Sequence, residues 1–120
     1  MQRAKQLTVC LNNKPGMLAE LCRVLANAKV SILAISVVDT AEAGLVRMVV
    51  DDPKTATRLL EAKGVSVIQS LVRLVELPNK VGALAELAER LGQRKVNIDY
   101  AYGSACGDKC ACFLVLQAKK

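Results

Sequence analysis

The segment LNNKPGMLAELCRVLANAKVSI, residues 11–32, decides the fold because it occurs twice in the chain. It aligns with LPNKVGALAELAERLGQRKVNI, residues 77–98, and 12 of the 22 aligned positions are identical. A constant offset of 66 residues over the whole segment indicates a duplicated structural unit. We therefore expect the 120-residue chain to consist of two small units, residues 1–69 and residues 70–120.

Hydrophobic periodicity and turn residues predict the secondary structure of the first unit. Apolar and polar residues alternate up to Leu11, which is typical of a half-buried strand, and Pro15–Gly16 turns the chain into a helix with one apolar face. Asp51 and Asp52 offer an N-cap for a second helix that ends at Gly64. The predicted strands cover 7–11, 30–38, 45–50 and 65–68, and the predicted helices cover about 16–28 and 53–63.

The second unit repeats part of this order. Its predicted elements are strands over 71–77, 96–102 and 111–117 and a helix over about 82–94. The first unit thus has the βαββαβ order of a ferredoxin-like α+β fold with an antiparallel sheet, and the second unit is truncated after its third strand. The open strand edge or helix face that results needs a cover. A second copy of the chain is the simplest cover, so we expect a homodimer.

The composition argues against several classes of function. Basic residues exceed acidic ones by six, but they are scattered along the chain in runs no longer than pairs, which is typical of a solvated surface. The chain has no histidine, which removes Ser-His and Cys-His nucleophile pairs and His-containing metal sites. No apolar stretch reaches the length of a membrane helix. We therefore expect a cytoplasmic, non-catalytic protein that needs no cofactor and binds neither a membrane nor a nucleic acid.

Two alternatives with the same fold have weaker signals. Cys106, Cys110 and Cys112 could bind a soft metal, but three thiolates make an incomplete structural site. A ferredoxin-like metal chaperone would also carry its cysteine pair in the first strand-to-helix loop, so we expect all five cysteines to be free thiols. An RNA-binding module would need aromatic residues on its central strands, and Phe113 alone makes no stacking platform.

The strand-to-helix loop is the best candidate for a binding site, because both copies carry it as Asn-Lys-x-Gly. A helix N-terminus presents unpaired N–H groups and a partial positive charge, which suit a carboxylate or phosphate. Gly16 and Gly82 have no Cβ, so a ligand can approach the backbone closely. Asn13 and Asn79 add side-chain amides that can both donate and accept hydrogen bonds. These groups suit a zwitterion such as an amino acid. The alternative is a purely structural turn, which would leave an interaction module.

These residues also resemble a known family. NNKPGMLAEL (residues 12–21) with VSI (residues 30–32), followed by DTAEAGLVRMVVDDP (residues 39–53), is similar to an ACT domain, and the doubled arrangement resembles small stand-alone tandem ACT proteins. The likeness extends from Leu7 to about Leu116. It implies a regulatory module that binds an amino acid, commonly at an interface between two ACT units, and it implies an enzyme as a regulated partner.

The resemblance also implies which residues line the site. In the first copy these are the loop residues and the start of the following strand: Asn13, Pro15, Gly16, Met17, Leu18, Ser31 and Ile32. In the second copy the matching residues are Asn79, Val81, Gly82, Ala83, Leu84, Asn97 and Ile98. Val81 replaces the proline that is usual before the glycine, so we expect the second loop to be less rigid or its site weaker.

Overall fold

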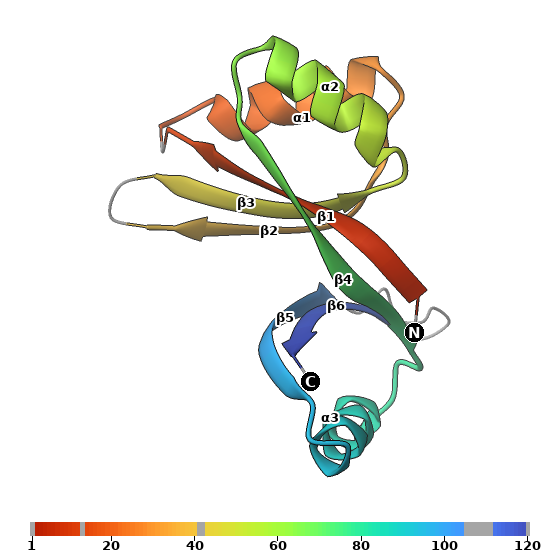
Figure 1. Ribbon diagram of the computed structural model, residues 1–120. Coiled ribbons are helices and arrows are strands. Elements are labelled where there is room, and N and C mark those ends of the chain that lie inside the picture. The colour runs from red at the N-terminus through yellow and green to blue at the C-terminus, as the bar shows by residue number, and fades with distance from the viewer. Residues whose placement is uncertain (1, 13, 41–42, 105–111, 120) are drawn as a thin grey trace. The chain divides into compact units, whose positions relative to one another are not determined.

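The computed structural model describes residues 2–12, 14–40, 43–104 and 112–119 (Figure 1). The elements are β1 (Gln2–Leu11), α1 (Met17–Asn27), β2 (Ile32–Asp39), β3 (Gly44–Val50), α2 (Pro53–Ala62), β4 (Val67–Leu77), α3 (Ala83–Gln93), β5 (Asn97–Ser104) and β6 (Cys112–Lys119). They form two compact units, Lys5–Ser70 and Leu71–Lys120, and the residues before Lys5 belong with the latter. We refer to these as the first unit and the second unit.

The first unit is the predicted α+β unit. Strand β3 pairs antiparallel with both β1 and β2, and the strand order is β2-β3-β1-β4. Helices α1 and α2 lie on one face of this sheet (Figure 1). This arrangement confirms the predicted βαββαβ pattern.

An aliphatic core joins the sheet of the first unit to its helices. Leu7 of β1 and Met48 of β3 pair with each other across the strands, and neither side chain is exposed to solvent. Leu25 of α1 and Leu60 of α2 belong to the same buried cluster. Burial of such side chains contributes about 1.5–3 kcal/mol each, so this cluster stabilises the unit.

Helix α2 begins and ends as the sequence predicts. The Asp52 carboxylate accepts a hydrogen bond from the Thr55 N–H at 3.1 Å and Pro53 occupies the first turn. At the other end Gly64 has a φ of +82°, and the Val65 N–H donates to the Leu60 carbonyl at 3.0 Å. The left-handed backbone at this position explains why the helix ends at a glycine.

The cap makes the stability of α2 depend on pH. The hydrogen bonds from Thr55 lower the pKa of Asp52 below its ordinary value of 3.8. A carboxylate with a lowered pKa stabilises the folded state above its ordinary pKa, and this contribution is lost as the pH falls through the folded-state value. Asp52→Asn keeps a capping oxygen without the charge, so it should lower the melting temperature at pH 7. The difference from the wild type should vanish below the pKa of Asp52; a difference that persists there would contradict this assignment.

The second unit contains a shorter set of elements. Strand β6 pairs antiparallel with β4 and β5, giving the order β4-β6-β5, and α3 is the one helix in its described residues. Its buried cluster consists of Val75, Leu77, Ala83, Leu87 and Leu91. One helix among the described residues of this unit agrees with the predicted truncation.

The edge of β4 in the second unit is not left for another chain to cover. Strand β1 borders β4 in the strand order, and the part of β1 before Lys5 belongs to the second unit. The start of β1 therefore stands where the missing fourth strand would lie. The first strand is therefore longer than the predicted 7–11, because β1 begins at Gln2.

Strand β4 also differs from its prediction. Sequence analysis expects separate strands over 65–68 and 71–77, whereas the structure has one strand, Val67–Leu77. Gln69 and Ser70 interrupt the apolar pattern, but neither residue breaks an extended backbone as proline would. The strand therefore continues from the first unit into the second.

Candidate functional site

The loop between β1 and α1 leaves the N-terminus of α1 without a side-chain cap. Gly16 precedes the helix with φ +89° and ψ −11°, a left-handed conformation that favours glycine. The Met17 N–H donates to the Lys14 carbonyl at 3.4 Å and the Glu20 N–H donates to the Gly16 carbonyl at 3.0 Å. Asn13 lies outside the described residues.

The loop before α3 has the same geometry. Gly82 has φ +89° and ψ −8°, the Ala83 N–H donates to the Lys80 carbonyl at 3.3 Å, and the Glu86 N–H donates to the Gly82 carbonyl at 3.0 Å. Val81 in place of Pro15 therefore leaves the backbone unchanged. The expectation that the second loop is less rigid or its site weaker stays a prediction.

Both helix N-termini keep free donors. No side chain caps α1 or α3, and the N–H groups of Leu18 and Ala19 find no acceptor among the described residues. The same holds for Leu84 and Ala85. Two adjacent N–H groups at the positive end of a helix can receive a carboxylate.

The predicted loop residues differ in their exposure to solvent. Pro15, Gly16 and Leu18 are exposed, whereas Met17 is half-buried. In the second copy Val81, Gly82 and Leu84 are exposed. Asn79 is also exposed, and it already interacts with another group of the protein. Ala83 is 8% exposed, so it can offer its backbone but little side-chain surface.

The structure does not bring Ser31 and Ile32 to the loop of their own unit. Ile32 pairs with Val50, while β1 ends where Leu11 pairs with Gly44, at the other end of β3. Helix α1, 11 residues long, runs between the two ends, a distance of about 16 Å at 1.5 Å per residue.

The backbone of Ser31 already has a partner. Its N–H donates to the Asp51 carboxylate at 2.9 Å, and its carbonyl accepts from the Asp51 N–H at 3.0 Å. Asp51 is therefore not part of the helix cap but ties β2 to the end of β3. Asn97 and Ile98 have the corresponding place in the second unit, where Asn97 pairs with Lys119 and Leu77 with Cys112 at the other end of β6.

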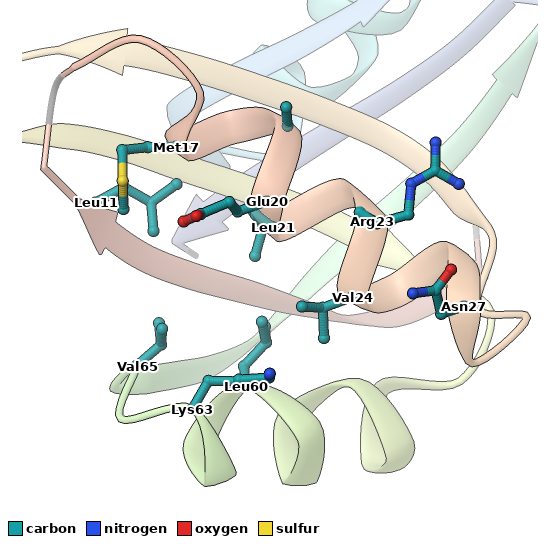
Figure 2. Close-up of a pocket in the computed structure, with 11 residues that line it drawn as sticks. Leu11, Met17, Glu20, Leu21, Arg23, Val24, Asn27, Leu60, Lys63 and Val65 are labelled. Carbon is teal, nitrogen blue, oxygen red and sulfur yellow. The ribbon is translucent and has the colours of Figure 1, made fainter.

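A groove between α1 and α2 is a feature that the sequence analysis missed (Figure 2). Its volume is about 770 Å³, and Val24 points from α1 toward α2. The lining residues are mostly apolar with four polar side chains at the rim: Leu11, Met17, Ala19, Glu20, Leu21, Arg23, Val24, Asn27, Leu60, Lys63 and Val65. The groove reaches the loop between β1 and α1, since it includes Leu11 and Met17.

Glu20 is a further residue that sequence analysis did not select. It lies in the first turn of α1, next to the free N–H groups, and the duplication places Glu86 in the same turn of α3. An ammonium group needs an acceptor of this kind close to the carboxylate site. Identity of this glutamate in both copies was the signal that could have identified it.

The described residues do not suggest a metal centre. No group of three metal-ligating side chains occurs among them. Cys106 and Cys110 lie outside the described residues, as does the side chain of Cys112. Cys10 and Cys22 are free thiols. None of the helices in the described ranges has the length and hydropathy needed to cross a membrane.

Comparison with known proteins agrees with this geometry. Residues 2–119 match the family described as the ACT domain pair. The chain belongs to the ACT domain family. No curated protein sequence gives a significant match to this ACT pair. Among solved structures, protein BT0572 from Bacteroides thetaiotaomicron is 31% identical with a TM-score of 0.90, over 98% of this chain and 81% of that one.

Two more distant structures share the fold of the ACT pair. The ligand-free regulatory subunit of aspartate kinase from Thermus thermophilus is 16% identical with a TM-score of 0.69, over 95% of this chain and 82% of that one. Aspartokinase III from E. coli, solved in complex with lysine and aspartate, is 18% identical with a TM-score of 0.53. That comparison covers 97% of this chain and 28% of the kinase. The suspected resemblance to tandem ACT proteins is confirmed.

Proposed function

We propose that this ACT pair is a non-catalytic regulatory protein that binds an amino acid at its strand-to-helix loops. The observation that carries the proposal is the matched geometry of the two loops, each with a left-handed glycine and two free N–H groups. The ligand carboxylate would lie on the N–H groups of Leu18 and Ala19. Its ammonium would lie near Glu20, or near Asn13 as the sequence suggests.

A second ACT unit would complete the site. Strand β2 is terminal in the strand order, so its outer edge has no partner within the described chain. Antiparallel pairing of two β2 strands from two copies would place Ser31 and Ile32 of one copy at the Asp39 end of the other. That end carries Gly44 and Leu11 of the neighbouring strands, and therefore the loop. The two sets of predicted site residues would then meet between copies.

The fold of the related structures supports a regulatory role. One is a regulatory subunit of aspartate kinase, and another is a kinase crystallised with lysine and aspartate. An amino acid as ligand and an enzyme as partner are thus the chemistry we propose for this chain. A thermal-shift screen against the common amino acids tests it, and no stabilisation by any of them would favour an interaction module with structural loops.

The proposed pairing predicts a homodimer held by apolar residues of β2. Ile35 and Val37 are 40% and 51% exposed beside the open edge. Ile35→Lys should place a charge at the two-fold axis and give a monomer in sedimentation at micromolar concentration, where the wild type should be a dimer. Val81→Lys, at a fully exposed loop position, is the matched control and should stay dimeric. A monomeric wild type would rule out this pairing.

A further inference from the structure

The groove between α1 and α2 begins at the strand-to-helix loop of the first unit. Leu11, the last residue of β1, and Met17, the first residue of α1, both line it. Ala19, whose N–H is one of the two free donors of the loop, also lines it. The groove volume of about 770 Å³ lies within the usual range of pockets that bind small molecules, about 300–1,000 Å³. A molecule held at the loop can therefore extend into this groove.

The floor of the groove is aliphatic near the loop. Leu21 is 4% exposed and Leu11 is 9% exposed, while Met17 and Val65 are half-buried (Figure 2). None of the three aliphatic side chains can form a hydrogen bond, so a charged group of a ligand would lose its hydration here without compensation. The floor thus favours an apolar group.

Charged side chains of both signs lie at the rim of the groove near the loop. Glu20 is in the first turn of α1 and Lys63 is the C-cap residue of α2, and Figure 2 shows both at the end that Met17 lines. No ion pair or hydrogen bond of either side chain is found among the described residues. The other polar lining residues, Arg23 and Asn27, lie farther along α1. This end of the rim complements a zwitterion better than a simple carboxylic acid, which the Glu20 carboxylate would repel.

The two copies share the loop but not the apolar lining. The glycine before the helix and the glutamate in its first turn occur in both copies. Met17 and Val24 of the groove, in contrast, correspond to Ala83 and Arg90 at the offset of 66 residues. The common groups suit the ammonium and carboxylate that all amino acids have. The residues that differ are those that would contact the side chain, the part that distinguishes one amino acid from another.

We propose that the groove receives the side chain of the amino acid bound at the first loop, and that this side chain is large and apolar, as in leucine, methionine or phenylalanine. The inference rests on the proposed function, because the loop holds the ammonium and the carboxylate. Leu21 follows Met17 by one helical turn, about 6 Å at 1.5 Å per residue. A side chain the size of leucine or larger spans this distance, whereas the methyl group of alanine does not. A lysine or glutamate side chain would bring its charge onto the aliphatic floor.

Titration calorimetry of the full chain with leucine, methionine, phenylalanine, alanine, glutamate and lysine tests the proposal. The tightest ligand should be one of the first three. It should bind at least about tenfold more tightly than alanine, since each fully buried methylene group raises the affinity about fourfold.

Met17→Gln nearly keeps the size of the side chain but makes it polar. It should weaken binding of the tightest apolar ligand about tenfold and leave the affinity for alanine unchanged. Val65→Thr keeps the shape of valine and should give a smaller loss in the same direction. Ile68→Gln is the matched control, because Ile68 is an apolar residue of β4 that is 67% exposed and does not line the groove. It should bind all ligands as the wild type does, and circular dichroism without ligand checks that each variant folds.

Several results would overturn the groove as the side-chain site. Equal affinity for alanine and for the larger apolar amino acids would show that the groove stays empty, although the loop would still bind amino acids. Tightest binding of glutamate or lysine would contradict the apolar class in the same way. Equal weakening by Met17→Gln and Ile68→Gln would show that Met17 has no specific role. If none of the six amino acids binds, the proposed function fails together with this inference.

Discussion

Leu7→Arg should unfold the first unit, whereas Arg73→Leu at the equivalent position of the second unit should leave the protein folded. Leu7 has no exposed surface and faces Met48 in the core. An arginine there would bury a charge without a partner and displace the packing of α2. Loss of a buried leucine alone costs about 2–5 kcal/mol, and the unpaired charge adds several more, which approaches the whole stability of a small domain.

A urea titration followed by circular dichroism measures both variants. Arg73 is exposed, so its replacement should change the free energy of unfolding by no more than about 0.5 kcal/mol. The pair of variants is matched because both exchange the residue of one copy for that of the other. A cooperative, near-native transition for Leu7→Arg would show that the two copies do not differ in the way that we infer.

Gly16→Asn should abolish the stabilisation that an amino acid gives through the first loop. A Cβ at Gly16 meets no atom within 4 Å, so the added side chain would fill the open space in front of the loop. Asparagine tolerates the left-handed φ of +89°, which valine would not, so the variant should still fold. At about 100 times its dissociation constant, a ligand stabilises the folded state by about 2.7 kcal/mol per site. This corresponds to a rise in melting temperature on the order of 10 °C, which the variant should lose.

Gly64→Asn is the matched control for the loop. Gly64 also has a left-handed φ, +82°, and also has free space around its Cβ position, but it follows α2 and touches neither loop. It should keep the full ligand-induced rise. Gly82→Asn reports on the second loop in the same way. If Gly16→Asn and Gly82→Asn both keep the rise, the loops are turns and the ligand binds elsewhere.

The sequence was sufficient to predict the first unit because its signals are local. Alternating residues, the Asp52 cap and the glycine at the end of α2 each specify an element without reference to distant residues. The full extent of β1 and β4, the strands at the boundary between the two units, could not be predicted in this way. Residues 2–6 are mostly polar, and they become part of β1 through backbone pairing with a strand more than 60 positions away.

The candidate site was predictable to the extent that it lies in one loop. The duplication pointed to Gly16 and Gly82, and both have the left-handed backbone that only a special residue type adopts readily. The position of Ser31 at the opposite end of the sheet follows from strand register, which the sequence alone does not give. The groove beside Met17 depends on how α1 and α2 pack, so the sequence alone could not predict it either.

The shared strands restrict how this protein can be made and how it could have evolved. Because β1 and β4 each serve both units, a nascent chain that ends before β4 lacks the strand that borders β1. Completion of the first unit must therefore wait until translation has passed Ser70, within β4. A gene fragment cut at the boundary of the repeat would likewise sever β4 and would separate the first residues of β1 from their neighbours. Recombination should consequently transfer the two ACT units together rather than one unit at a time.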